Sequence, residues 1–229
     1  MRDAVVYYSN TGQSKAVADY LADRLGYPLT DLQESGEVQY ENLVLVFPVH
    51  CQNLPDCVKD FLKKAQVERL TAIATFGKMC CGNVLYEIQR HYQPNVIAGA
   101  YLPTKHSYIE ADDAFCDFDE LEPIIDKIRQ PFSIVRLPKL YKNPFSNLYP
   151  KLRSRLGVAL RKTADCNGCN LCRAACPLKA ISSGVPDERC IRCLKCVDAC
   201  PRKALQVRPG WPLKLYLRKK KDSKLRIYV

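Results

Sequence analysis

Four short runs of apolar residues stand out in the first half of the chain, each five or six residues long. They are rich in valine, leucine, isoleucine and aromatic residues. Continuous apolar runs of this length predict strands that are buried on both faces of a sheet. Together with one weaker run, the predicted strands are Ala4–Tyr8, Pro28–Leu32, Leu43–Phe47, Ala72–Phe76 and Val96–Tyr101.

Stretches with apolar residues at helical spacing separate these runs. The first extends from Ala16 to Leu25 and stops before Gly26 and Pro28, which end a helix. Further helices are predicted at Cys57–Lys64, Asn83–His91 and Asp119–Gln130. Buried strands that alternate with amphipathic helices predict an α/β domain over residues 1–130, a doubly wound parallel sheet with helices on both faces.

The alternation ends at Pro131, where prolines begin to recur with aromatic residues between them. We expect residues 131–162 to form a basic connector, since loops of this length usually wrap a surface. Within it, Lys151–Lys162 is predicted to form a short basic helix. The aromatic rings expected to pack on both flanking domains are those of Phe132, Tyr141, Phe145 and Tyr149.

The last part of the chain contains a short internal repeat. The segment CNGCNLCRAACP, which begins at Cys166, returns 24 residues later as CIRCLKCVDACP, which begins at Cys190. After each Cys-Pro pair, one residue is followed by Lys-Ala in both copies. The duplication predicts a small α+β domain with pseudo-two-fold symmetry at residues 163–207, followed by a basic tail at residues 208–229.

Cysteine usage points to metal rather than to disulfides. The chain has 13 cysteines in 229 residues, and eight of them lie between Cys166 and Cys200. An odd count without a secretory signal favours reduced thiols, and therefore a cytoplasmic location. No apolar run approaches the roughly 18 residues that a transmembrane helix needs, so none is expected.

Charge divides the chain as sharply as the cysteines do. Residues 1–130 carry 12 Lys and Arg against 19 Asp and Glu, a net charge of −7, whereas residues 131–229 carry 23 against 5, a net charge of +18. Two oxidised iron–sulfur sites of about −2 each would leave the second part near +14. This remaining positive charge is compatible with acidic redox partner proteins and with weak contact of the basic tail with a membrane surface. Nucleic acid is not expected, because no base-stacking motif accompanies the charge.

The doubled cysteine run suits two [4Fe-4S] clusters. Three thiolates from one tight loop can surround three irons, and in two-cluster proteins the fourth cysteine of each run ligates the other cluster. Two zinc sites are the alternative, but zinc ribbons use pairs of cysteine pairs rather than two triplets each followed by Cys-Pro. The predicted ligand sets are Cys166, Cys169, Cys172 and Cys200 for one cluster, and Cys190, Cys193, Cys196 and Cys176 for the other.

Over about Thr163–Val207, these motifs resemble bacterial ferredoxins that carry two [4Fe-4S] clusters. Both copies match the motif without a substitution. The resemblance implies low-potential, one-electron transfer between two nearby clusters, without chemistry on a substrate.

The loop after the first predicted strand has the composition of an anion site. It opens a helix, so its backbone N–H groups and the positive helix end are available to a phosphate. A helix cap made by Thr11 or Ser14 is the alternative. No Gly-Lys-Ser or Gly-Lys-Thr is present, which argues against a nucleoside triphosphatase. The candidate phosphate ligands are Ser9, Asn10, Thr11, Gly12, Gln13 and Ser14.

This loop resembles the Ser/Thr-x-Thr-Gly-x-Ser/Thr phosphate motif of flavodoxins, over roughly residues 1–130. The resemblance implies bound FMN, with the flavin ring between two later loops at the carboxyl ends of strands. FMN is favoured over FAD because no second nucleotide fingerprint exists. The ring-binding residues that the resemblance implies are Pro48, Val49 and His50 in one loop and Thr75, Phe76 and Gly77 in the other. Neither loop contains tryptophan.

The order of the two parts resembles the flavodoxin–ferredoxin fusion proteins of anaerobic bacteria and archaea. This implies a low-potential electron carrier in which FMN and two clusters exchange electrons within one chain and with redox partner proteins. Two alternatives remain: a flavin-dependent reductase that acts on a small substrate at FMN, and a nucleic-acid-binding module with structural clusters.

Three further features have two interpretations each. Cys51, Cys80 and Cys81 lie in the predicted ring loops, where a redox role competes with simple burial of a small side chain. His50 either hydrogen-bonds the flavin or is structural. The basic run Arg218–Lys221 is either solvated or in contact with anionic lipid or nucleic acid.

Overall fold

The computed structural model describes residues 2–36, 39–109, 117–147 and 156–229. They form two compact units: unit 1 comprises Met1–Ser146 and Lys221–Val229, and unit 2 comprises Asn147–Lys220. Unit 2 is therefore inserted into unit 1, because the chain returns to unit 1 after leaving unit 2. No helix in these described ranges is both long and apolar enough to cross a membrane.

Unit 1 is built on a sheet with parallel strands in the order β2-β1-β3-β4-β5. The strands are β1 (Arg2–Tyr7), β2 (Leu29–Asp31), β3 (Gln39–Pro48), β4 (Gln66–Phe76) and β5 (Val96–Pro103). This order is that of flavodoxin-like doubly wound folds, so the fold class predicted from the apolar runs is confirmed.

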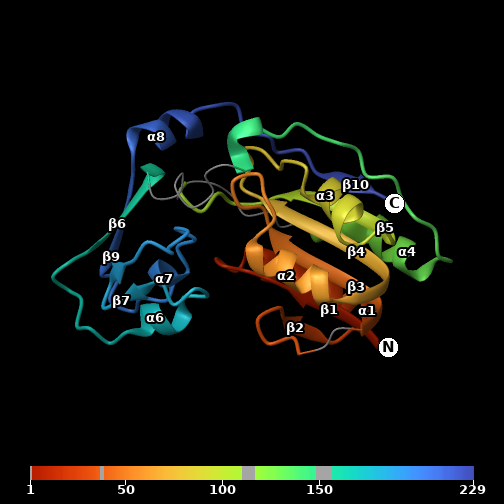
Figure 1. Cartoon of the computed structure of the whole chain (residues 1–229), viewed down its shortest axis with the longest axis horizontal. Coiled ribbons are helices and arrows are strands. Elements are labelled where there is room, and N and C mark those ends of the chain that lie inside the picture. Colours follow the sequence, from red (N-terminus) through yellow and green to blue (C-terminus); the bar gives the residue numbers. More distant parts are fainter. Residues whose placement is uncertain (1, 37–38, 110–116, 148–155) are drawn as a thin grey trace. The chain divides into compact units, whose positions relative to one another are not determined.

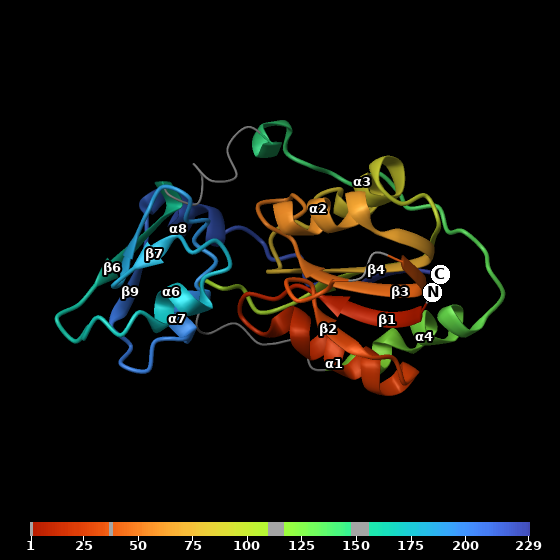
Figure 2. The ribbon, with the colours of Figure 1, turned by 60° about the horizontal axis from the view of Figure 1, so that its bottom comes forward.

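Helices cover both faces of the sheet, as Figure 2 shows. Alternate strand residues enter opposite cores: Val5 and Val44 pack on the side of α1, whereas Leu45 packs on the side of α2. Each such buried side chain stabilises the fold by roughly 1.5–3 kcal/mol. One layer contains α1 (Gln13–Leu25), η1 (Phe118–Leu121) and α4 (Glu122–Arg129), and the other contains α2 (Asp56–Lys64) and α3 (Val84–His91).

A strand from the end of the chain completes the sheet. β10 (Arg226–Tyr228) pairs antiparallel with β5 at the sheet edge, with Ile227 opposite Ala100 (Figure 1). Arg226 also forms an ion pair with Asp222 at 2.8 Å. The segment expected as a solvated tail therefore ends in a strand of unit 1.

The segment after α4 runs along β5 as a strap, which we define as residues 131–147. Leu137 is buried, with a side-chain atom 3.2 Å from the Cβ position of Gly99, and the N–H of Val135 donates to the carbonyl of Val96. Aliphatic side chains thus hold the strap. The expected packing of aromatic rings is wrong for Phe132, Tyr141 and Phe145, which are exposed, and Tyr149 lies outside the described residues. The strap ends in η2 (Pro144–Asn147).

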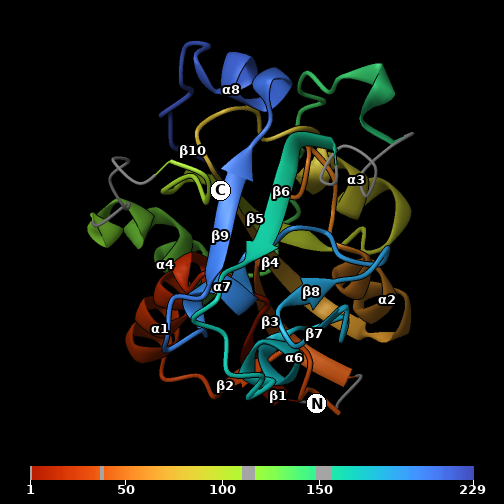
Figure 3. The ribbon, with the colours of Figure 1, turned by 90° about the vertical axis from the view of Figure 1, so that its left-hand side faces the viewer.

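The described residues of unit 2 form two small antiparallel pairs of strands and three short helices. β6 (Val158–Lys162) lies beside β9 (Leu205–Pro209) in Figure 3, and β7 (Ile181–Ser182) pairs with β8 (Val185–Pro186). The helices are α6 (Leu171–Ala175), α7 (Lys195–Asp198) and α8 (Trp211–Leu217).

The predicted basic helix at Lys151–Lys162 is wrong over its last five residues, which form β6. Val158 and Leu160 are buried, whereas Ala159 and Arg161 are exposed. This alternation has the period of a strand rather than that of a helix. Residues 151–155 lie outside the described residues.

Candidate cofactor sites

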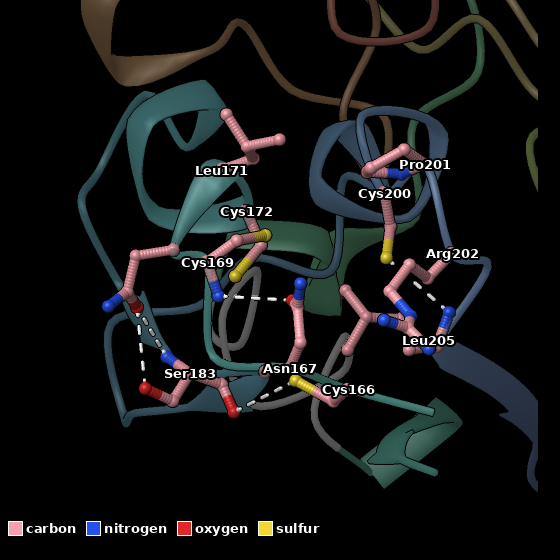
Figure 4. Close-up of a pocket in the computed structure, with 13 residues that line it drawn as sticks. Cys166, Asn167, Cys169, Leu171, Cys172, Ser183, Cys200, Pro201, Arg202 and Leu205 are labelled. Carbon is pink, nitrogen blue, oxygen red and sulfur yellow. Dashed lines mark hydrogen bonds between the residues drawn. The ribbon is translucent and has the colours of Figure 1, made fainter. Parts of the chain in front are cut away.

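In the described part of unit 2, two pockets are each lined by four cysteines. Figure 4 shows the sulfurs of the first pocket turned toward a common space. The first pocket combines Cys166, Cys169 and Cys172 of the first run with Cys200 of the second. The second combines Cys190, Cys193 and Cys196 of the second run with Cys176 of the first. The structure therefore brings together both predicted ligand sets.

The sequence repeat is also a repeat of backbone conformation. Asn170 and Leu194, which are 24 positions apart, both adopt positive φ, 59° and 68°, immediately before a short helix. Gly168 and Arg192 are likewise left-handed, with φ of 75° and 57°. These turns reverse the loop, so that the first three cysteines of each run face one space.

The two short helices then separate the third cysteine from the fourth. Cys172 and Cys196 are each the second residue of a helix, α6 and α7, and both are buried. Cys176 and Cys200 come just after these helices and precede a proline. The chain has turned by that point, and the fourth thiol of each run lines the pocket of the other run.

A backbone hydrogen bond reaches the fourth sulfur of each run. The N–H of Ala180 donates to Cys176 Sγ at 3.3 Å, and the N–H of Ala204 donates to Cys200 Sγ at 3.4 Å. A residue with left-handed backbone precedes each of these alanines. Lys179 precedes Ala180 and Lys203 precedes Ala204, and both lysines have φ of 50°. Hydrogen bonds to ligand sulfurs tune cluster potentials. Sequence analysis did not assign this role, although the repeated Lys-Ala was its signal.

Burial favours the neutral thiol form of two cysteines of the second pocket, Cys193 and Cys196. It raises the pKa of Cys193 to about 11 and that of Cys196 to about 12. Within the described residues, no three His, Cys, Asp or Glu side chains lie close enough together to hold a single metal ion.

The predicted phosphate loop joins β1 to α1 and contains buried polar atoms that lack a partner. Ser9 Oγ and Asn10 Oδ1 are buried and have no hydrogen-bond partner among the described residues. Buried polar atoms are normally satisfied, so this pair indicates a missing ligand. No side chain caps α1 in the described loop. Gly12 is the N-cap of α1; it is exposed and has φ of 83°, and Thr11 and Gln13 beside it are partly buried.

Hydrogen bonds join the three loops that the flavodoxin resemblance singles out. Asn10 Nδ2 donates to His50 Nε2 at 2.9 Å, and the hydroxyls of Ser14 and Thr75 are 2.8 Å apart. Burial lowers the pKa of His50 to about 4. The imidazole is therefore neutral near pH 7, and in the tautomer with its proton on Nδ1 its Nε2 accepts from the amide.

The ring-loop residues fall into two groups. Pro48, Val49 and His50 are partly buried at the end of β3, where the N–H of Val49 donates to the carbonyl of Thr75 at 2.7 Å. Phe76 is buried in the core of unit 1 and is thus part of the packing of the sheet. A Cβ on Gly77 would lie 2.7 Å from the ring of His106, so the absence of a side chain at this position lets that ring approach.

A tight turn follows β3. Reciprocal backbone hydrogen bonds of 2.9 Å between His50 and Asn53 close it, and its two central residues, Cys51 and Gln52, have φ of 50° and 67°. A Cβ on Gly82, in the loop after β4, would lie 2.5 Å from the carbonyl oxygen of Gln52. The two predicted ring loops are therefore in close contact at this point.

The strap holds the same two loops. The N–H of Asn143 donates to the side chain of Gln52 at 2.8 Å, and Asn53 Nδ2 donates to the carbonyl of Ser146 at 3.0 Å. Lys142 forms a largely buried ion pair with Glu87 of α3. These residues are far apart in sequence and share no motif, so sequence analysis gave no signal for them.

The segment of unit 1 that follows unit 2, Lys221–Val229, also contacts one of the predicted ring loops. The N–H of Asp222 donates to the carbonyl of Lys78 at 2.6 Å, in the loop after β4. Cys80 of the same loop lies 3.8 Å from the carbonyl of Tyr141 in the strap. Both segments of unit 1 that flank unit 2 in sequence are therefore anchored to the loop after β4.

Two models of known protein families match the cysteine-rich part of the chain. Residues 163–179 and residues 185–206 each match a family model described as a 4Fe-4S binding domain. Among solved structures, one described as a flavodoxin from the domain Archaea is similar to this chain. The match covers 57% of this chain and 100% of the flavodoxin, with 15% identity and a TM-score of 0.40. No curated protein matches the chain significantly.

These findings support an electron-transfer role with redox partners, because [4Fe-4S] clusters carry single electrons. The strand order of unit 1 by itself identifies its fold as flavodoxin-like, without reference to any relative. The chain thus combines a flavodoxin-like fold in unit 1 with two segments of unit 2 that match 4Fe-4S binding domains.

Proposed function

We propose that the chain is an electron carrier that holds FMN in unit 1 and two [4Fe-4S] clusters in unit 2. The observation that carries this proposal is the exchange of the fourth cysteine between the two pockets. FMN supplies one- and two-electron chemistry when bound, and each cluster supplies one-electron chemistry.

The residues of unit 2 fit the clusters in both number and placement. Each pocket offers four thiols and a backbone N–H that donates to one sulfur. Arg202 lines the first pocket and Arg192 the second, so a positive side chain lies near each group of thiolates. Positive charge favours ligand thiolates over thiols. Burial alone acts in the other direction, because it disfavours the charged thiolates.

The residues of unit 1 fit a phosphate ester at one end and a planar ring at the other. Ser9 Oγ is an unsatisfied donor of the phosphate loop, whereas Asn10 Oδ1 only accepts and therefore suits an N–H or hydroxyl group of the ligand rather than its phosphate; the side chain of Asn10 is oriented by His50. Neutral His50 adds no charge near the ring. We therefore propose that the phosphate lies at Ser9–Ser14 and the ring at the loops after β3 and β4.

Cofactor analysis of protein purified without oxygen tests this function. We expect about eight irons and eight sulfides per chain, as two cubanes require, and one FMN released on denaturation. Zinc in place of iron would contradict the cluster assignment, and FAD or no flavin after reconstitution would contradict the flavin assignment. A small organic acceptor reduced with multiple turnovers would favour the reductase alternative.

Two glycine variants test the ring loops. We expect Gly82→Ala to weaken FMN binding by at least about tenfold, because its Cβ would displace the carbonyl of Gln52 and with it the loop after β3. Gly26→Ala is the matched control: Gly26 also has positive φ, 69°, but its Cβ position has open space around it. Fluorescence titration of flavin-free protein measures both. Equal losses would show that backbone strain alone, and not the contact between the loops, matters.

A further inference from the structure

Helix α8 presents apolar side chains that nothing in the described part of the chain covers. None of its seven residues is buried. Trp211 is 77% exposed and Leu215, one turn later, is 58% exposed. Side chains four positions apart lie on the same side of a helix, so these two form one apolar face.

The helix is nevertheless held in place by the strands before it. The N–H of Gly210 donates to the carbonyl of Gly157 at 2.8 Å, next to the start of β6. The Cβ of Leu213 lies 3.6 Å from the Cβ position of Gly157. Leu156, beside this junction, is 71% exposed. We call Trp211 and Leu215 the α8 face.

Positive charge surrounds the α8 face, and acidic residues are absent from the sequence around it. Between Asp198 and Asp222 the chain has no Asp or Glu. The same interval contains the basic residues Arg202, Lys203, Arg208, Lys214, Arg218, Lys219, Lys220 and Lys221. Lys214 lies within α8, and the run Arg218–Lys221 directly follows it and is exposed.

We propose that the α8 face and the basic run bind the surface of a membrane that contains anionic lipid. Tryptophan favours the boundary between headgroups and acyl chains, where its ring is in an apolar layer and its N–H is hydrated. Basic side chains next to it are attracted by anionic headgroups. Stable peripheral binding takes two such signals, an apolar anchor and a polybasic patch, and this segment has both.

An acidic soluble protein is the competing occupant, and the apolar residues decide against it. Charge alone would draw such a protein to the basic run. It would leave Trp211 and Leu215 in water unless the partner also supplied a matching apolar pocket. A lipid surface accepts exposed aromatic and aliphatic side chains without a preformed pocket. This inference does not depend on which cofactors the chain holds.

Trp211 is the only tryptophan in the chain, so its emission reports directly on this face. The cofactor-loaded protein is mixed with vesicles of phosphatidylcholine alone or of phosphatidylcholine with phosphatidylserine, and binding is measured by flotation. We expect at least about tenfold tighter binding to the anionic vesicles, reversed by high salt. We also expect blue-shifted Trp211 emission and quenching by brominated acyl chains.

Matched variants separate the two signals. Arg218→Glu with Lys220→Glu should abolish flotation with anionic vesicles, whereas Lys63→Glu with Lys64→Glu, on exposed positions of α2, makes the same charge change and should not. Trp211→Ala should weaken flotation, whereas Phe132→Ala, which removes another exposed ring, should not. Each variant is first checked for wild-type iron content and visible absorption.

Three results would overturn the proposal. The first is equal binding to both kinds of vesicle, or none. The second is undiminished flotation of the Arg218→Glu, Lys220→Glu variant. The third is tighter binding to poly-glutamate than to anionic vesicles with unchanged Trp211 emission, which would assign the basic run to an acidic protein partner.

Discussion

Removing Cys193 and Cys196 together should leave a protein with one cluster, about four irons per chain. In this background Cys176 has no cluster to bind, whereas Cys200 lines the surviving pocket. Adding Cys176→Ala should therefore leave the iron content and the resonance signal of the reduced protein unchanged. Adding Cys200→Ala should remove a thiolate from the remaining cluster, with loss of most of that signal.

The two added substitutions are closely matched. Both remove the last cysteine of a run, both lie before a proline, and both sulfurs accept a hydrogen bond from an alanine N–H four residues later. Their environments therefore differ mainly in which pocket they line. The opposite outcome, a silent Cys200→Ala and a damaging Cys176→Ala, would show that each run holds its own cluster.

The sheet of unit 1 was predictable because burial on both faces leaves a continuous apolar run. Val44 and Leu45 enter opposite cores, so neither position in β3 tolerates a polar residue. The cysteine pockets were predictable for a different reason. A duplicated run with fixed spacing constrains the backbone so strongly that the same left-handed turns occur at Asn170 and Leu194.

The remaining features depend on contacts between distant segments. β10 has only three residues, the first of them Arg226, and its strand conformation comes from pairing with the edge of β5. β6 was mistaken for a helix because five residues give too short a pattern to separate the two periods. The strap contacts at Gln52 and Asn53 use a backbone N–H and a backbone carbonyl, which any residue supplies. Local sequence patterns therefore do not predict such contacts.

The insertion of unit 2 into unit 1 bears on how the two parts exchange electrons. The chain leaves unit 1 after Ser146 and returns at Lys221, so both ends of unit 2 are tethered to unit 1. Tethering fixes an effective concentration of one cofactor near the other that does not change with dilution. A single flexible linker would restrict the approach of the two units less than two connections do.

Electron transfer between the clusters and FMN should therefore be first order. After the clusters are reduced by a short pulse, we expect the rate of FMN reduction to stay constant over a hundredfold dilution of the protein. The control is a mixture of two variants, Gly82→Ala from which FMN has been removed, and one that lacks both clusters through alanine at Cys169, Cys172, Cys193 and Cys196. In that mixture the rate should fall in proportion to concentration, because the cofactors are on separate chains. A wild-type rate that also scales with concentration would mean that the two units exchange electrons only with other molecules, and the fusion would then serve to bring both to a common partner.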